Sequence, residues 1–350
     1  MKKPIAITLG DPAGIGPEII AKSFRDAPEE MRGCFVVGDV ATMRRVSALI
    51  SPGHTRLPVV CFETPSEALA APPRCLPVLQ VGTPRTPVAF GVIGADAGHL
   101  AAECVVWAAK AALRREISAM VTAPLHKEAL ALAGKPHSCY PGHTEMLQAL
   151  AAAHAGVPLA DMPVRMMLAN DELRVVLLSI HMSLSEAIKA VTFDNLVQTL
   201  CIAHRSLLTI LGRAPKIGVA GLNPHAGEGG MFGREEIDII APAIAVARSQ
   251  GMDVDGPFAP DTVFMRARSQ HGKPGAFDVV IALYHDQGLI PVKYLGVDKG
   301  VNVTLGLPLV RTSPDHGTAF DIAGLGVADP SSLISAVRVA RQMSTLTKKI

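Results

Sequence analysis

Three short apolar runs, each leading into a histidine, constrain the fold of this chain more than any other feature. They span residues 174–180, 216–224 and 279–284, and they lead into His181, His225 and His285. Runs of this kind, rich in β-branched residues, are typical of strands buried on both faces, as in a parallel sheet. Because α/β proteins bind ligands at the carboxyl ends of such strands, the sequence predicts an α/β fold with three imidazoles at one sheet edge.

Three imidazoles at one edge are a candidate metal site. Histidine ligands suit Zn²⁺ or another borderline divalent ion, with each nitrogen roughly 2.0–2.1 Å from the metal. A single histidine after a strand is more often a structural residue with its hydrogen bonds satisfied, so the hypothesis depends on all three. Such an ion could polarise a substrate hydroxyl or carbonyl or activate a water, and the histidines alone leave these roles open.

The rest of the chain alternates predicted strands and helices, which is typical of α/β domains. With 350 residues the chain is long for one core, so two lobes are expected. Residues 51–90 are rich in proline and predict irregular chain with short edge strands.

Composition excludes several classes of function. The net charge of +2 and the aromatic content of 4% offer neither a field for polyanions nor stacking platforms, so no nucleic acid is expected. No stretch reaches the roughly 18 apolar residues that a membrane helix requires, so no membrane partner is expected. The six cysteines include no C-x-x-C pair, which predicts reduced thiols and a cytoplasmic location.

A second group of side chains supplies hydrogen-bond donors without neighbouring carboxylates, as a bound oxyanion requires. The candidates are His143, Thr144, Lys293, Asn302 and Arg311. The first two lie beside the first turn of a helix predicted over residues 146–154, where a phosphate or carboxylate is favoured. Two alternatives stay open: the cationic members make surface salt bridges, and Thr144 only caps that helix.

Residues 313–330 read Ser-Pro-Asp-His-Gly-Thr-Ala-Phe-Asp-Ile-Ala-Gly-Leu-Gly-Val-Ala-Asp-Pro and resemble the adenosine-binding loop of isopropylmalate and isocitrate dehydrogenases. The Gly-Asp-Pro-Ala-Gly-Ile-Gly-Pro-Glu stretch at 10–18 resembles the opening of the same superfamily. The resemblance implies that Asp321 accepts hydrogen bonds from the ribose hydroxyls and repels a 2′-phosphate, which favours NAD over NADP. The other cofactor-binding residues that it implies are His316, Ala319 and Asp329.

Within that superfamily the chain resembles the 4-hydroxythreonine-4-phosphate dehydrogenase (PdxA) family. The matching stretches follow one another along most of the chain: 10–18, 121–127, 142–145, 221–230, 256–264, 284–288 and 300–326. The resemblance implies an isocitrate/isopropylmalate dehydrogenase-like fold, with two α/β/α lobes and an active-site cleft between them. It also implies a homodimer with the active site at or near the subunit interface. We expect residues 1–125 plus 300–350 to form the first lobe, and 126–299 to form the second, with the metal site and dimer contacts.

The resemblance also assigns roles to the candidate residues. The metal ligands fall on His181, His225 and His285, and the substrate-binding positions on His143, Thr144, Lys293, Asn302 and Arg311. The implied reaction is NAD-linked oxidation of the secondary alcohol of a small phosphorylated hydroxy acid, with decarboxylation of the β-keto acid. Zinc is the expected metal, with Mg²⁺, Co²⁺ and Mn²⁺ as alternatives. Asp261 and Lys293 are candidates for proton transfer.

Other functions stay open within and beyond this family. Paralogues oxidise 4-phospho-threonate or 4-phospho-erythronate, and a more distant relative oxidises the cis-dihydrodiol of terephthalate. Phosphate acyltransferases use a related fold but need neither three metal-binding histidines nor an acidic ribose contact. A non-catalytic relative would bind a metal or NAD without turnover.

Overall fold

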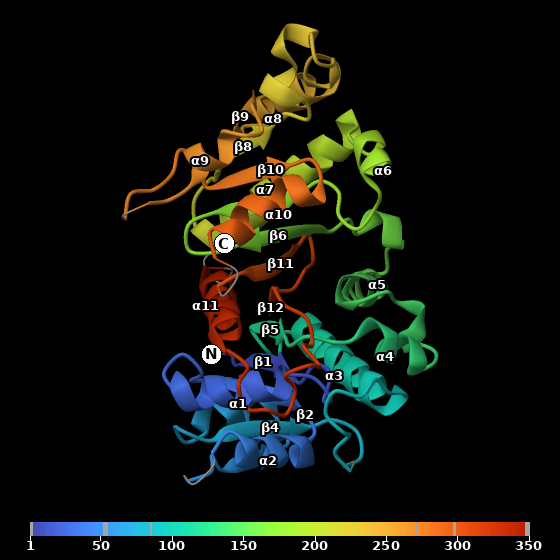
Figure 1. Cartoon of the computed structure of the whole chain (residues 1–350), viewed down its shortest axis with the longest axis vertical. Coiled ribbons are helices and arrows are strands. Elements are labelled where there is room, and N and C mark those ends of the chain that lie inside the picture. The colour runs from blue at the N-terminus through green and yellow to red at the C-terminus, as the bar shows by residue number, and fades with distance from the viewer. Residues whose placement is uncertain (1–2, 52–54, 85, 271, 297–298, 347–350) are drawn as a thin grey trace. The chain divides into compact units, whose positions relative to one another are not determined.

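The computed structural model describes residues 3–51, 55–84, 86–270, 272–296 and 299–346 (Figure 1). The chain divides into two compact units. Unit 1 comprises Met1–Pro163 with Leu307–Ser344, and unit 2 comprises Val164–Gly306 with Thr345–Ile350. Each unit has its own part of a β-sheet with helices against it, which confirms the predicted α/β class.

The sheet of unit 1 has the strand order β3-β4-β2-β1-β5-β12, with parallel pairs. Its strands are β1 (Ile5–Thr8), β2 (Cys34–Gly38), β3 (Val59–Phe62), β4 (Leu76–Gln80), β5 (Ala119–Thr122) and β12 (Arg311–Pro314). Its helices are α1 (Gly16–Asp26), α2 (Val40–Leu49), η1 (Pro65–Ala70), α3 (Ala95–Leu113), α4 (Lys127–Leu132), η2 (His137–Cys139), α5 (His143–Ala155), η3 (Leu159–Asp161) and α11 (Ser331–Leu346). Every residue of β1, β2 and β5 is buried, which explains their continuous apolar sequences.

The proline-rich segment 51–90 contains one strand that is not at an edge. β4 pairs with β2 on one side and with β3 on the other, and its Leu76 and Val78 are fully buried. The prediction that this segment holds only edge strands is therefore wrong for β4, because burial of its apolar side chains outweighs the local proline content.

Helices α3 and α4 approach each other so closely that Gly98 is required at their crossing. A Cβ atom on Gly98 would lie 1.9 Å from the Ala129 carbonyl oxygen. Helix α5 also contacts α3. These contacts keep residues 126–163 in unit 1, so the boundary falls at Pro163 rather than at the residue 125 expected from the sequence.

The sheet of unit 2 has the order β11-β6-β7-β10-β8-β9, with antiparallel pairs from β11 to β7 and parallel pairs from β7 to β9. Its strands are β6 (Arg165–Ala169), β7 (Arg174–Leu177), β8 (Lys216–Ala220), β9 (Asp253–Phe258), β10 (Val279–Ala282) and β11 (Val301–Leu305). Its helical segments are α6 (Leu184–Lys189), α7 (Phe193–Leu211), η4 (Pro224–Gly230), η5 (Glu236–Ile240), α8 (Ala241–Ser249), α9 (Val263–Ala267) and α10 (His285–Tyr294).

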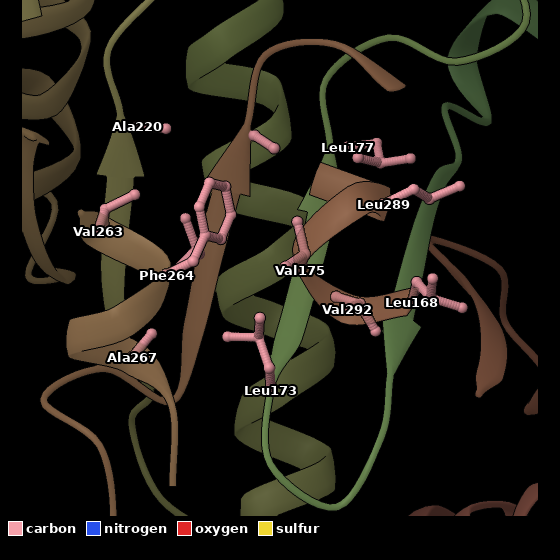
Figure 2. Close-up of a cluster of buried hydrophobic side chains, with 12 residues drawn as sticks. Leu168, Leu173, Val175, Leu177, Ala220, Val263, Phe264, Ala267, Leu289 and Val292 are labelled. Atoms are coloured by element: carbon pink, nitrogen blue, oxygen red, sulfur yellow. The ribbon is translucent and has the colours of Figure 1, made fainter. Parts of the chain in front are cut away.

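The core of unit 2 lies between its strands and helices α9 and α10 (Figure 2). Phe264 of α9 and Leu289 of α10 pack against one face of the strands, and α7 lies behind the opposite face. A Cβ atom on Gly288 would lie 2.5 Å from the Leu177 side chain, so glycine lets α10 come close to β7. This packing fixes the start of α10, where His285 lies.

Two chain-wide expectations can be compared with the structure. All six cysteines are free, as predicted from their scattered spacing. Within the described part of the chain, no helix combines the length and the apolar character that crossing a bilayer demands.

Candidate active site

Strands β7, β10 and β8 are parallel neighbours in unit 2, so their carboxyl ends share one edge of the sheet. His181 follows β7, His285 begins α10 directly after β10, and His225 lies in the loop after β8. The prediction that the three apolar runs are strands of a parallel sheet is confirmed. All three histidines therefore leave the sheet at the same edge.

Side-chain hydrogen bonds join the three strand ends to one another. Ser179 Oγ donates to the Leu283 carbonyl at 2.9 Å, which links the end of β7 to the end of β10. Gln287 Oε1 accepts from Leu283 N at 2.7 Å, and its Nε2 donates to the Gly221 carbonyl at 2.8 Å. Sequence reasoning missed Gln287, whose only signal is its place directly after the His-Asp pair.

The rings of His181 and His285 lie together, with centroids 5.7 Å apart and planes at 45°. Both line a pocket of about 540 Å³ at the edge of unit 2. His285 Nδ1 lies 2.7 Å from Asp286 Oδ1. Because an ionised carboxylate only accepts, Nδ1 is the donor, which leaves Nε2 to bind a metal, as in carboxylate–histidine–metal arrangements.

His225 lies in a left-handed turn. Six consecutive residues have positive φ: His225 (54°), Ala226 (53°), Gly227 (81°), Glu228 (43°), Gly229 (66°) and Gly230 (97°). This conformation costs roughly 1–2 kcal/mol for each residue with a side chain, so the surrounding structure must stabilise it. Strain of this kind concentrates at functional sites.

The described residues of the single chain contain no group of three His, Cys, Asp or Glu side chains arranged to hold a metal ion. His225 has Phe232 as its ring neighbour, with centroids 6.1 Å apart. The structure therefore brings two of the three expected metal ligands together within one chain. Imidazole nitrogens, with a carboxylate hydrogen-bonded to His285, nevertheless match the donors that a zinc-like ion prefers.

Three oxyanion candidates lie in unit 1, and of these Arg311 on β12 is 4% exposed. Its Nε and Nη2 donate to Thr122 Oγ1 at 3.1 and 2.8 Å. Burial lowers the pKa of Arg311 to about 10, and the charge of Glu145 opposes this shift, so the guanidinium stays charged at neutral pH. Thr122 is a positioning residue that the donor-based reasoning did not single out.

His143 is held neutral beside this guanidinium. Burial, followed by the positive charge of Arg311, lowers the His143 pKa well below 6.5. Its Nε2 is enclosed and has no hydrogen-bond partner among the described residues. Gly142 occupies the N-cap position of α5 without a side-chain cap bond, so the alternative that Thr144 caps this helix is wrong.

The remaining catalytic and substrate candidates all lie in unit 2. Lys293 is in the last turn of α10, and Asn302 is on β11. The buried Oδ1 of Asn302 has no hydrogen-bond partner within the described structure. Asp261 is exposed in the loop between β9 and α9.

The expected cofactor loop lies against the first strand-to-helix turn of unit 1. Ile15 N donates to the Thr318 carbonyl at 3.0 Å, and a Cβ atom on Gly14 would lie 2.8 Å from the same oxygen. Phe320 stacks on His126, with ring centroids 4.9 Å apart. The two stretches that resemble the dehydrogenase superfamily are therefore in contact.

The four expected cofactor residues differ in their surroundings. Asp321 is exposed, and Ala319 has a φ of 40°. His316 Nδ1 lies 3.0 Å from the Gly317 carbonyl oxygen. Asp329 Oδ1 accepts from Ser331 N at 2.9 Å and from Ser331 Oγ at 2.6 Å, so it bonds the first residue of α11. These hydrogen bonds lower the Asp329 pKa.

A buried ion pair holds the end of this loop. Glu18 and Lys22 of α1 lie 3.1 Å apart. Glu18 accepts from the backbone N–H groups of Gly326 and Ala328 at 3.2 and 2.8 Å, and Lys22 donates to the Ala328 carbonyl at 2.6 Å. Sequence reasoning did not identify this pair, whose signal is an acid and a base four residues apart on one helix.

Comparison with known proteins extends over nearly the whole chain. Residues 30–340 match the family described as pyridoxal phosphate biosynthetic protein PdxA. A 4-hydroxythreonine-4-phosphate dehydrogenase of Beijerinckia indica subsp. indica is 49% identical over 344 residues, which cover 98% of this chain and 96% of that protein. A D-threonate 4-phosphate dehydrogenase of Salmonella typhimurium is 42% identical over 342 residues, with coverage of 98% and 99%. The crystal structure of 4-hydroxythreonine-4-phosphate dehydrogenase from Klebsiella pneumoniae aligns with a TM-score of 0.84, 41% identity and 98% coverage of both chains.

Proposed function

Because the chain belongs to the PdxA family of pyridoxal phosphate biosynthetic proteins, we propose that it is a metal-dependent, NAD-linked dehydrogenase. Its substrate is a small phosphorylated hydroxy acid such as 4-hydroxythreonine 4-phosphate, whose secondary alcohol is oxidised, with decarboxylation of the β-keto acid. The observation that carries this proposal is that β7, β10 and β8 are parallel neighbours whose ends all lead into histidines.

The proposed metal ligands are His181, His225 and His285. When bound, a divalent ion supplies Lewis-acid chemistry that lowers the pKa of a substrate hydroxyl. The Asp286 carboxylate orients the His285 ring and increases the basicity of its free nitrogen. Zinc fits neutral imidazoles best, and Mg²⁺, Co²⁺ and Mn²⁺ are the alternatives.

A homodimer with its active site at or near the subunit interface is part of this proposal. One chain brings His181 and His285 together, while its described residues contain no metal-binding group of three. A second copy of the chain would complete the ligand set with its own His225. Mixing His181→Ala and His225→Ala proteins tests this arrangement, since activity would return only if ligands are shared between subunits.

Arg311, His143 and Thr144 are proposed to bind the substrate phosphate. The charged guanidinium offers paired N–H donors, and the neutral His143 ring offers one more hydrogen-bonding nitrogen. Thr122 holds the guanidinium in place through two hydrogen bonds. Lys293 and Asn302 are proposed as further substrate ligands.

NAD is the proposed cofactor, with adenosine bound by the loop that contains His316, Ala319, Asp321 and Asp329. The exposed Asp321 carboxylate can accept from both ribose hydroxyls and repels a 2′-phosphate, so NADP is disfavoured. The Asp329 carboxylate already accepts two bonds from Ser331, so it shapes the loop as well. Asp261 and Lys293 are the proposed proton-transfer groups, and the free cysteines support a cytoplasmic location.

Two alternatives within the family differ in substrate. A paralogue would oxidise 4-phospho-threonate or 4-phospho-erythronate, and the buried Arg311 site would serve their phosphate equally well. A dehydrogenase of the terephthalate cis-dihydrodiol would need no phosphate site. An acyltransferase, the alternative from a different class, would use neither the histidines nor Asp321.

A panel assay of NADH absorbance tests the proposal. The purified protein is given 4-hydroxythreonine 4-phosphate, 4-phospho-threonate, 4-phospho-erythronate and an aromatic cis-dihydrodiol, each with and without a chelator. We expect chelator-sensitive turnover of the first substrate above the others. Preference for a phosphorylated aldonate would assign the paralogue function, and turnover of none would contradict the proposal.

A further inference from the structure

One buried carboxylate lies against the turn that carries His225. Glu236 is 3% exposed, and its Oε1 accepts hydrogen bonds from the backbone N–H groups of Leu222 and Asn223, both at 2.7 Å. Its Oε2 accepts from Asn223 Nδ2 at 2.9 Å. Three N–H donors compensate for the hydration that the buried carboxylate has lost, and bonds to a charged acceptor are stronger than neutral ones.

Two glycines leave room for this carboxylate. A Cβ atom on Gly221 would lie 3.1 Å from Glu236 Oε1, and one on Gly227 would lie 2.8 Å from Oε2. Gly221 directly follows β8, whereas Gly227 belongs to the left-handed turn. The carboxylate therefore touches both the strand end and the turn, and it fixes the path of the chain between them.

The element that supplies Glu236 is itself unusual. Glu236 begins the five-residue π-helical segment η5, which continues into α8. Single π-helical turns are rare and are frequently found at functional sites. The hydrogen bonds of Glu236 go to Leu222 and Asn223, which precede His225, so its influence on the imidazole passes through the backbone.

We propose that Glu236 is a positioning residue for His225, which it holds ready to bind the divalent ion. This inference rests on the proposed function, because it takes His225 to be a metal ligand. A left-handed turn with three non-glycine residues is unfavourable on its own, so without the carboxylate the turn would relax. The ion would then have to order the turn as it binds, which lowers its affinity.

A purely structural role for Glu236 makes a different prediction. In that case its replacement would lower the stability of unit 2 but would leave the affinity for the metal unchanged once the protein is folded. Metal affinity, measured apart from turnover, therefore separates the two roles. The neighbouring Glu235 is a matched control, because its carboxylate accepts from the same Asn223 Nδ2 at 2.7 Å.

The experiment titrates metal-stripped, full-length protein with Zn²⁺ by calorimetry and with Co²⁺ by visible absorption. Glu236→Gln keeps the size of the side chain but removes its charge and turns one acceptor into a donor. We expect it to weaken Zn²⁺ binding about 10- to 100-fold and to change the Co²⁺ spectrum. Its affinity for NAD⁺ should stay within about twofold of wild type, and so should the Zn²⁺ affinity of Glu235→Gln. Asn223→Ala, which removes the Oε2 bond, should weaken binding in the same direction but less.

The outcomes distinguish this inference from the proposed function. Wild-type Zn²⁺ affinity and Co²⁺ spectrum in Glu236→Gln would overturn the positioning role while leaving the metal site intact. If that variant does not fold, Asn223→Ala decides, and unchanged affinity there overturns the inference. If the wild-type protein binds neither Zn²⁺ nor Co²⁺, the proposed metal site is overturned, and this inference with it.

Discussion

The centroids of the His181 and His285 imidazole rings lie 5.7 Å apart in unit 2. They leave the ends of adjacent parallel strands, β7 and β10. The Ser179 hydroxyl, two residues before His181, is bonded to the Leu283 carbonyl, two residues before His285. The parallel pairing of β7 with β10 and the hydrogen bond of Ser179 therefore position the two imidazoles together.

Replacement of Arg311 by lysine should impair use of a phosphorylated substrate. The variant keeps the positive charge but loses the planar fork and its two bonds to Thr122. Since a hydrogen bond to a charged group contributes about 1.5–3 kcal/mol, kcat/KM should fall about 10- to 100-fold. Arg338→Lys, in an exposed ion pair with Glu30, should leave kcat/KM unchanged. Equal kcat/KM in wild type and Arg311→Lys would exclude Arg311 from phosphate binding.

Replacement of Asp321 by alanine should change cofactor preference. Loss of the acceptor for the ribose hydroxyls should raise the KM for NAD⁺ about tenfold, and loss of the negative charge should reduce discrimination against NADP⁺. Steady-state kinetics with both cofactors measures the two effects. Asp26→Ala, an exposed change on α1, is the control. An unchanged ratio of kcat/KM for the two cofactors in Asp321→Ala would refute this role.

His143 should make the stability of the protein depend on pH. Burial and the Arg311 charge lower its pKa below the ordinary 6.5, so the unfolded chain binds the proton more readily than the folded chain. Between the pKa of His143 in the folded protein and 6.5, the free energy of unfolding should therefore rise with pH. The stability that the neutral His143 contributes should be lost as the pH falls through that window.

Thermal unfolding from pH 5 to 8 measures this dependence. His143→Gln should lose less stability than wild type on acidification, because it has no imidazole to protonate. His154→Gln changes an exposed residue of the same helix and should follow the wild-type profile. Identical pH profiles for wild type and His143→Gln would contradict the assignment.

Replacement of Gly98 by alanine should destabilise unit 1. The new methyl group would overlap the Ala129 carbonyl, 1.9 Å from the Cβ position, so α3 and α4 would have to separate. Overpacking of this kind costs about 1–3 kcal/mol or more. Denaturant unfolding measures the loss, with Gly317→Ala as the control, because a Cβ atom there meets nothing within 4 Å. A stability equal to wild type would mean that the helices are less tightly packed than described.

The parts of the fold that the sequence predicted are those set by burial along a strand. Strands β7, β8 and β10 were recognisable because apolar runs continue until the chain reaches the sheet edge, where polar residues begin. Prolines in residues 51–90 predicted short edge strands. The sequence does not show that β3 pairs with the outer side of β4, which places β4 inside the sheet.

The parts of the candidate site that the sequence did not predict depend on contacts between distant segments. Gln287 joins Leu283 to Gly221, and Glu236 joins η5 to the end of β8. Residues 223–230 are rich in glycine, but nothing in their sequence indicated that His225 itself is left-handed. Such conformations are set by tertiary hydrogen bonds and not by the local sequence.

The most direct test of the central claim is the dependence of turnover on a metal ion and on His225. NADH formation from 4-hydroxythreonine 4-phosphate is measured in metal-stripped wild type and His225→Ala, before and after addition of Zn²⁺. The account predicts that stripped wild type is inactive and recovers with the ion, whereas His225→Ala still binds NAD⁺ but does not turn over. A normal kcat for His225→Ala in metal-free buffer would contradict it.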